Sequence, residues 1–449
     1  MDFLIRFTQS HETFRLPEIQ ALAALEGIEL IVKDYQTDSP FCLVTLPSPA
    51  AARRLVARAI LVQSIYEHWA TATTLPALRS AVRSSPQASR PEYATCSFKF
   101  TFDSFQATRP HADKIAIIDS FSFLPFSGPI AMRDPDAEFA ILEEWALGST
   151  LLGVTEPARV HFGRLVGAGA RELSGVYNLK KRKYISTTSM DSELALVTAN
   201  LALAAPGKLF YDPFVGTGSF PVACAHFGAL AFGSDIDGRS IRGGAKGGVK
   251  ANFEQYGLGH LLGGMFAADL TNTPLRVGGG RRLWDGIVCD PPYGVREGLK
   301  VLGSRDPKEG DEAVRREKSY LPDYIPPKKP YSFLAMLDDI LAFAADSLVD
   351  GGRLAFWMPT SNEEAEEIRP PTHPRLEIVA VCSQDFNKWS RKLIAYRRIP
   401  DAEVDQDAER AWVAAQADKG KGGAGADGTT ANELNPFRKM YFTKPASQS

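Results

Sequence analysis

The segment Asp290-Pro291-Pro292-Tyr293-Gly294 combines an acid, two prolines and an aromatic residue. An amine outside a base ring is a weak nucleophile, because its lone pair is delocalised into the ring. The Asp290 carboxylate and the Pro291 carbonyl could accept hydrogen bonds from the two N–H groups of such an amine. This would direct the lone pair of the amine at a methyl donor. Consecutive prolines fix φ and hold these acceptors in place, and Tyr293 offers a face for stacking. A bare proline turn would explain PPYG, but the added acid predicts methylation of a planar exocyclic amine.

A glycine-containing turn upstream, running from Asp212 to Ser219 as DPFVGTGS, has the properties of a cofactor loop. Gly216 and Gly218 lack a Cβ, so the backbone can turn tightly and approach a ligand. The following helix offers free N–H groups to a carboxylate, and Asp212 suits an ammonium group. Phe214 lies in the same turn. The dinucleotide pattern GxGxxG is absent, because the sequence here is GTGSFP.

Acids also end the next two predicted strands. Asp235 and Asp237 follow the second strand, where Asp235 could accept hydrogen bonds from both hydroxyls of a ribose. Asp269 follows the third and could accept one from an adenine amino group. Any one of these acids could be a helix N-cap. Acids at three successive strand ends predict an adenosyl cofactor, S-adenosylmethionine.

The elements that position these residues alternate between short apolar strands and helices. Helices are expected at Asp191–Ala204, before the first strand, and at Ser332–Leu348, before the fifth. This alternation is typical of a parallel α/β sheet. The short connection between the last two strands indicates an antiparallel pair at one edge, as in the seven-stranded, Rossmann-like class I methyltransferase fold. The expected strands are Lys208–Asp212, Leu230–Ser234, Gly264–Ala268, Trp284–Asp290, Arg353–Trp357, Leu376–Cys382 and Lys392–Tyr396.

Residues 1–160 have an α+β pattern without an obvious catalytic cluster. Leu55, Ala59, Val62, Ile65 and Trp69 recur at helical spacing within an alanine-rich segment. The expected elements are strands at Phe3–Phe7, Phe41–Leu46, Ser97–Phe102 and Ile115–Ile118, and helices starting near Leu16-Pro17-Glu18 and covering Ala50–Ala70.

The composition does not identify a binding partner, so local features of the sequence must do so. The formal net charge of −2 gives no global argument for nucleic acid, and the largest basic patch is the run Lys180, Lys181, Arg182 and Lys183. The five scattered cysteines and seven histidines predict no metal site. No stretch suits a membrane span or a secretory signal, so we expect a cytoplasmic protein with reduced cysteines.

Two segments interrupt these patterns. The charged, proline-containing stretch Leu299–Lys329 is expected to be an excursion on the active-site side of the sheet. Residues 419–430, in a tail covering residues 401–449, are of low complexity and predict flexibility. The aromatic residues that follow, from Asn435 to Phe442, predict a segment that docks on the folded chain.

Together these motifs resemble the catalytic subunits of eukaryotic tRNA guanosine-10 N2-methyltransferases, a family with a THUMP domain. The resemblance covers most of residues 160–300 and more loosely the N-terminal half. It is carried by Leu179–Tyr184, Thr187–Ala195, Asp212–Phe220, Gly233–Arg239, Asp290–Gly294, Phe14–Glu18, Phe98–Phe100 and Phe123–Ile130.

The resemblance implies N2-methylguanosine in tRNA as product and a small zinc-binding activator protein as partner in a heterodimer. It implies cofactor contacts for Thr188, Ser189 and Glu193, which otherwise fit a helix cap, and phosphate contacts for the basic run. The implied domains are an N-terminal domain at 1–75, a tRNA-binding THUMP domain at 76–160, a linker at 161–185 and the methyltransferase domain at 186–400.

Other functions stay open on the residues alone. Methylation of adenine N6, of guanine N2 in ribosomal RNA or of a protein glutamine would use similar chemistry. A non-catalytic RNA-binding subunit is opposed by the intact acids Asp212, Asp235, Asp269 and Asp290. Because guanine N2 in folded tRNA is paired or stacked, we expect the nucleotide to be flipped outward.

Overall fold

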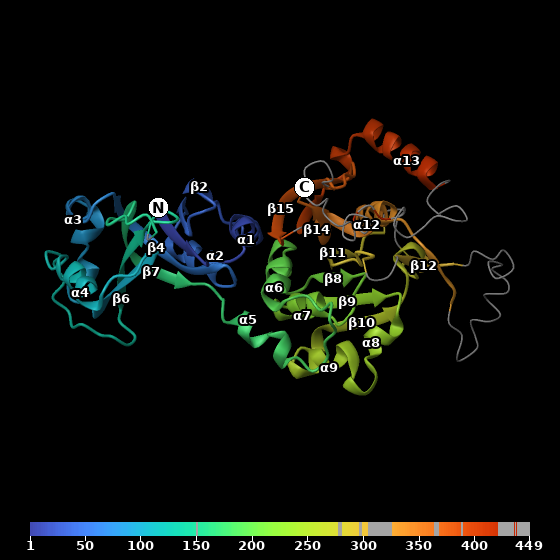
Figure 1. The fold of residues 1–449 in the computed structure, drawn as a ribbon, viewed down its shortest axis with the longest axis horizontal. Coiled ribbons are helices and arrows are strands. Elements are labelled where there is room, and N and C mark those ends of the chain that lie inside the picture. Colours follow the sequence, from blue (N-terminus) through green and yellow to red (C-terminus); the bar gives the residue numbers. More distant parts are fainter. Residues whose placement is uncertain are drawn as a thin grey trace, which may run out of the picture. The chain divides into compact units, whose positions relative to one another are not determined.

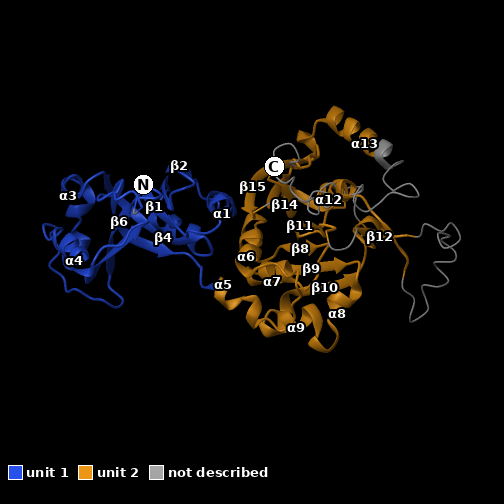
Figure 2. Cartoon of the chain, viewed as in Figure 1, with its two compact units in different colours: residues 1–173 blue, residues 174–449 orange. Residues whose placement is uncertain are grey.

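The computed structural model describes residues 1–149, 151–276, 281–295, 299–303, 326–362, 368–387, 389–420, 435 and 437. Contacts divide the chain into two compact units, Met1–Leu173 and Ser174–Ser449 (Figure 2). Most of the expected excursion, the low-complexity residues 421–430 and the tail residues 438–442 lie outside the described residues. In the described part of the chain, no helix is long and apolar enough to cross a membrane.

The first unit is built on a seven-stranded sheet in the order β2-β3-β1-β4-β7-β6-β5 (Figure 1). Neighbouring strands are antiparallel except β5 and β6, which are parallel. The strands are β1 (Asp2–Phe7), β2 (Ile31–Tyr35), β3 (Phe41–Thr45), β4 (Val62–Ala72), β5 (Phe98–Phe105), β6 (Ala137–Glu144) and β7 (Arg159–Ala168). The helices are α1 (Glu12–Glu26), α2 (Pro49–Val56), α3 (Leu75–Arg83) and α4 (His111–Asp119), with 3₁₀ turns at Pro86–Ser89 and Pro91–Tyr93.

Three predictions for this unit are wrong. The helix expected over Ala50–Ala70 ends at Val56, and β4 follows, because its β-branched and aromatic residues pair with β1 and β7 and this pairing overrides alanine's helix propensity. The strand expected at Ile115–Ile118 lies in α4. Helix α1 begins at Glu12, so Pro17 lies inside it rather than in its first turn.

The expected linker at 161–185 starts too early, because β7 continues to Ala168 in the middle of the sheet. One continuous sheet includes strands on both sides of the expected boundary at residue 75. That boundary and the remaining domain limits stay predictions.

The second unit contains the sheet expected from the sequence, in the order β10-β9-β8-β11-β14-β16-β15. The first five strands are parallel, and β16 runs antiparallel to both β14 and β15. The seven predicted strands are therefore confirmed, with ends shifted mostly by one to a few residues. They are β8 (Leu209–Asp212), β9 (Leu230–Asp235), β10 (Leu262–Ala267), β11 (Trp284–Cys289), β14 (Leu348–Ser361), β15 (Leu376–Asp385) and β16 (Trp389–Arg398).

Helices cover this sheet, and some of them begin at side-chain caps. Asp191 caps α6, and Ser332 caps α12, whose apolar side packs on buried residues of β8, β11 and β14. Helix α7 contacts β8, β9 and β11. The helices are α5 (Leu173–Val176), α6 (Ser192–Leu201), α7 (Ser219–His226), α8 (Gly238–Arg242), α9 (Gly248–Gln255), α12 (Phe333–Ser347) and α13 (Gln406–Gly420), with 3₁₀ turns at Leu179–Lys181, Gly244–Lys246, Gly259–Leu261, Leu270–Asn272 and Asp401–Glu403.

A short antiparallel pair, β12 (Lys300–Leu302) with β13 (Lys328–Pro330), joins the two ends of the predicted excursion. Tyr331 N donates to Leu299 O at 2.9 Å beside this pair. The excursion thus leaves and re-enters the described structure at one place, beside residues 290–294.

Candidate active site

The carboxyl ends of β8, β9, β10 and β11 meet at a cavity of about 900 Å³. This is the edge of a parallel sheet at which ligands bind, and the volume is typical of a small-molecule site. Each strand contributes one acid to the lining: Asp212, Asp235, Asp269 and Asp290. Four residues far apart in the sequence are therefore brought together as the strand pattern predicted.

Most predicted site residues line this cavity. The ones that do are Thr188, Ser189, Asp212, Phe214, Gly216, Asp235, Asp269, Asp290, Pro291, Pro292 and Tyr293. Glu193, Gly218 and Asp237 are not among the described lining residues. Lining residues that the sequence reasoning missed include Thr217, Tyr331, Asp339, Trp389 and Arg391.

The glycine loop owes its shape to two positive φ angles. Gly216 has φ +48°, and its N–H donates to Asp235 Oδ2 at 3.0 Å. Gly218 has φ +82° at the N-cap of α7, where an added Cβ would lie 2.6 Å from Val249 Cγ1. Gly218 is thus required for the turn and for packing, whereas Gly216 borders the cavity.

The strand-end acids differ in how much of their hydrogen-bonding capacity the protein uses. Asp235 also accepts from Asp237 N at 2.8 Å, so its carboxylate ties the second strand end to the glycine loop. Asp237 caps α8 and pairs with Arg239. Asp269 accepts from Thr271 N at 3.1 Å and from Leu302 N at 2.7 Å, so it is an N-cap that also holds β12 at the cavity.

Burial places two of these carboxylates in an unfavourable electrostatic environment. The pKa of Asp212 lies well above its usual range because the group is buried, and the negative charges of Asp235 and Asp290 raise it further. Burial also raises the pKa of Asp290 to about 6, although the Tyr293 hydroxyl and the Arg391 guanidinium lower it. Asp290 Oδ1 is shielded from solvent and has no hydrogen-bond partner among the residues that the structure describes. The cavity therefore suits a cation and a hydrogen-bond donor.

Aromatic side chains surround residues 290–294, the predicted catalytic segment. The Tyr293 ring lies edge-on to Trp389, with centroids 6.3 Å apart. Phe386 stacks on Trp389 at 4.5 Å, and Arg391 lies over the Trp357 ring at 4.7 Å. These residues come from β14 and from the β15–β16 hairpin, and no local pattern in the sequence marks them.

Comparison with known proteins decides which family this arrangement belongs to. Residues 1–171 match the description "Tmrp11 THUMP N-terminal domain", and residues 180–302 match "RMKL-like, methyltransferase domain". The chain is 42% identical over 403 residues to tRNA (guanine(10)-N(2))-methyltransferase of Saccharomyces cerevisiae, covering 88% of this chain and 92% of that protein. The chain belongs to the tRNA (guanine(10)-N(2))-methyltransferase family.

Two further members are also similar to this chain. The protein of the same description in Schizosaccharomyces pombe is 36% identical, with 89% of this chain and 90% of the relative covered. The tRNA (guanine(10)-N(2))-methyltransferase TRMT11 of Homo sapiens is 33% identical, with 88% of each covered. The resemblance inferred from the sequence, including a THUMP-type N-terminal domain, is thereby confirmed.

The four residues of the basic run, 180–183, differ in their exposure to solvent. Lys180, Lys181 and Lys183 are exposed. Arg182 is buried, and its Nη1 donates to Ser219 Oγ at 2.8 Å at the start of α7. A side chain held in this way supports the helix, so within this run only the three lysines present their charge to solvent.

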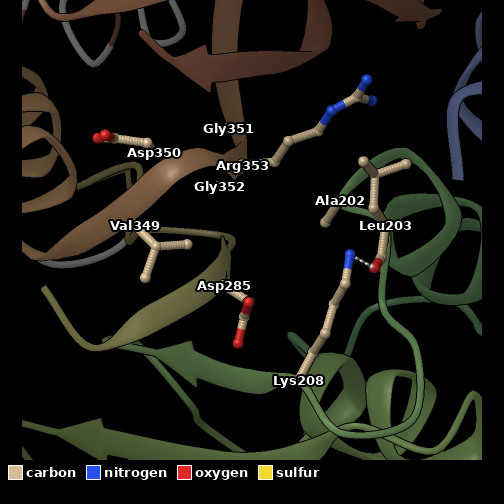
Figure 3. Close-up of a pocket in the computed structure, with 9 residues that line it drawn as sticks. All are labelled: Ala202, Leu203, Lys208, Asp285, Val349, Asp350, Gly351, Gly352 and Arg353. Carbon is tan, nitrogen blue, oxygen red and sulfur yellow. Dashed lines mark hydrogen bonds between the residues drawn. The ribbon is translucent and has the colours of Figure 1, made fainter. Parts of the chain in front are cut away.

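In this methyltransferase a second, smaller hollow of about 150 Å³ lies where β8, β11 and β14 begin (Figure 3). Lys208 Nζ donates to Leu203 O at 3.0 Å, and Asp285 accepts from Leu209 N at 2.9 Å. Arg353 Nη1 donates to Leu201 O at 2.8 Å. These hydrogen bonds satisfy backbone polar groups of the segment that leads from α6 into β8. The hollow lies at the edge of the sheet opposite the four strand-end acids.

Proposed function

We propose that this chain transfers a methyl group from S-adenosylmethionine to the exocyclic N2 of guanosine 10 in tRNA. The observation that carries the proposal is the convergence of Asp212, Asp235, Asp269 and Asp290 on one cavity beside Tyr293. Curated relatives covering most of the chain carry this activity in their names.

The residues of the cavity fit S-adenosylmethionine, which supplies an electrophilic methyl group when bound. The cofactor carries a sulfonium and an ammonium charge, and either would favour the ionised form of Asp212, whose pKa is raised by burial and further by the charges of Asp235 and Asp290. Asp235 and Asp269 would hold the ribose and the adenine. Phe214, Gly216, Thr188 and Ser189 complete the lining on this side.

The catalytic segment would hold the target amine. The Asp290 carboxylate is mostly ionised at neutral pH. This carboxylate and the Pro291 carbonyl would accept hydrogen bonds from the two N–H groups of N2. The N2 lone pair would form the bond to the methyl carbon as the carbon–sulfur bond breaks and leaves its electron pair on sulfur, and N2 would release one proton to solvent after transfer. Tyr293 provides a stacking surface, which requires the guanine to be flipped out of the tRNA. Pre-positioned acceptors lower the barrier because no reorganisation is needed.

Two further parts of the chain would engage macromolecules in the cytoplasm. The THUMP-type unit would hold the acceptor end of tRNA, with Lys180, Lys181 and Lys183 contacting phosphates. The small zinc-binding activator would pair with β10, whose outer side has no partner strand among the described residues. Leu262, Met265 and Phe266 are half-buried on this edge strand, and a partner would bury them.

The test is to incubate the chain, with and without the activator, with labelled S-adenosylmethionine and total tRNA. Nucleoside analysis should find the label in N2-methylguanosine, and primer extension should place it at position 10. Label in adenosine, or in DNA or protein alone, would contradict the proposal.

A further inference from the structure

The C-terminal tail contacts the catalytic segment through Asn435. This side chain is 3% exposed, and its Nδ2 donates to the Tyr293 carbonyl oxygen at 2.8 Å. The two residues are 142 positions apart. Because a backbone carbonyl only accepts, the Asn435 amide must present its nitrogen here. The tail thus fixes the main chain of the residue that provides the aromatic surface.

Gly294 is shaped to receive this contact. It has φ +68°, and an added Cβ would lie 2.6 Å from Asn435 Nδ2 and 3.0 Å from Leu299 Cγ. A side chain at this position would therefore displace the Asn435 amide. The last residue of the catalytic segment and the tail asparagine occupy complementary space.

Phe437 makes the second contact and lines the cavity itself. It is 2% exposed. Its ring lies edge-on to Tyr293, with centroids 6.4 Å apart and planes at 87°, and its centroid is 5.6 Å from that of Trp389. Tyr293, Trp389 and Phe437 are thus mutually edge-to-face, an arrangement that aromatic quadrupoles favour. The orientation of the Tyr293 ring is fixed from two sides.

We propose that Asn435 and Phe437 are positioning residues for methyl transfer, which hold Tyr293 where the target guanine stacks. Phe437 also forms a wall of the base pocket. This inference rests on the proposed function. The cofactor is expected to bind beside the glycine loop on the other side of the cavity, so cofactor affinity should not depend on the tail.

The experiment compares three full-length variants with the wild type, each with the activator present. Asn435→Asp replaces the donor with an acceptor of equal size and sets it against the Tyr293 carbonyl. Phe437→Leu keeps apolar volume but removes the ring, and Val413→Ala is a matched control on exposed α13. Measurements are kcat and KM for tRNA, the Kd for S-adenosylmethionine by calorimetry, and the melting temperature.

Both tail variants should lower kcat by about tenfold or more, since a misplaced reacting group costs that much. The Kd for S-adenosylmethionine should stay within about twofold of the wild type, because a lost contact worth 1.4 kcal/mol would change it tenfold. Val413→Ala should behave as the wild type. Wild-type kcat in both tail variants would overturn the inference, and so would a parallel loss of cofactor affinity and melting temperature. A wild-type enzyme that leaves tRNA guanosine 10 unmethylated would instead overturn the proposed function.

A double-mutant cycle with Gly294→Ala sharpens the test. Alanine at φ +68° is strained on its own, so the single variant cannot separate strain from the clash with Asn435. Adding Asn435→Ala removes the clash but not the strain. The two losses in kcat should therefore be less than multiplicative. Strictly multiplicative losses would show that Asn435 does not act through this segment.

Discussion

The THUMP-type unit and the methyltransferase unit both bury carboxylates, but they surround them differently. In the first unit Glu67 pairs with Arg90 at 2.8 Å and with Arg164 at 3.0 Å, and Glu143 pairs with Arg109 at 2.7 Å. In the second, Asp212 lies beside other acids, and burial raises its pKa. The acids of the first unit face arginines, whereas Asp212 and Asp290 are buried close to one another at the cavity.

The pKa of Glu144 makes the contrast quantitative. Its carboxylate accepts from Arg159 and from His161, and these contacts hold its pKa at about 2 despite burial. A lowered pKa stabilises the folded state at pH above the unfolded value, and this contribution is lost as the pH falls toward 2. For Asp290 the sign is reversed, because its folded pKa of about 6 lies above the unfolded value. Folding stabilises the charge on one carboxylate and destabilises it on the other.

The largest expected effect is on catalysis. Asp290→Ala removes the acceptor of the target amine and should lower kcat by at least about 100-fold. Affinity for tRNA, measured by filter binding, should be nearly unchanged, since phosphate contacts dominate it. Loss of tRNA binding together with turnover would show that Asp290 supports the fold.

The matching change in the first unit should act on stability alone. Arg159→Ala leaves the Glu144 carboxylate buried without its two hydrogen bonds of 2.8 and 3.0 Å from Arg159. We expect a loss of about 3 kcal/mol, followed by chemical denaturation. The Kd for S-adenosylmethionine should not change; a weaker Kd would show that the two units are energetically coupled.

Asp290→Asn should have the opposite effect on stability. Above pH 6 the ionised, buried carboxylate destabilises the folded state, and the neutral amide removes this penalty. The expected gain is about 1–3 kcal/mol at pH 7.5, from a pKa shift of about two units. Thermal melts at pH 7.5 and pH 4 measure it. The gain should disappear at pH 4, where the wild-type carboxyl is protonated in the folded state, and a gain that persists at pH 4 would contradict the charge explanation.

The smallest expected effect is the acid limb of the rate profile. Because the ionised Asp290 accepts from the amine, kcat/KM should fall by about tenfold between pH 7.5 and pH 5. The midpoint should lie near the Asp290 pKa of about 6. A flat profile over this range would mean that the carboxylate titrates outside it.

The sequence predicted the half of the site that follows strand ends. Asp212, Asp235, Asp269 and Asp290 could be placed because parallel strands bring their carboxyl ends to one edge, and the alternation of strands and helices was clear. The prediction did not separate ligand contacts from structural roles. Gly218 fixes a turn and Asp237 caps a helix, and a glycine or an acid looks the same in either role.

The other half of the cavity depends on contacts between distant segments. Trp389 and Arg391 reach the cavity because β16 lies between β14 and β15. Phe437 reaches it because the C-terminal part of the chain comes back to this cavity. Aromatic and basic residues at such positions carry no periodic signal. The wrong helix at Ala50–Ala70 has the same cause, since pairing with strands before and after β4 overrode a local pattern.

The return of Asn435 to Tyr293 also bears on biosynthesis. A chain leaves the ribosome with its N-terminal residues first. All four strand-end acids emerge long before the asparagine that contacts their neighbour 142 residues upstream. If Asn435 and Phe437 position Tyr293 as proposed, a chain that ends just before Asn435 should transfer the methyl group about tenfold more slowly or worse, so full activity would require translation past residue 437.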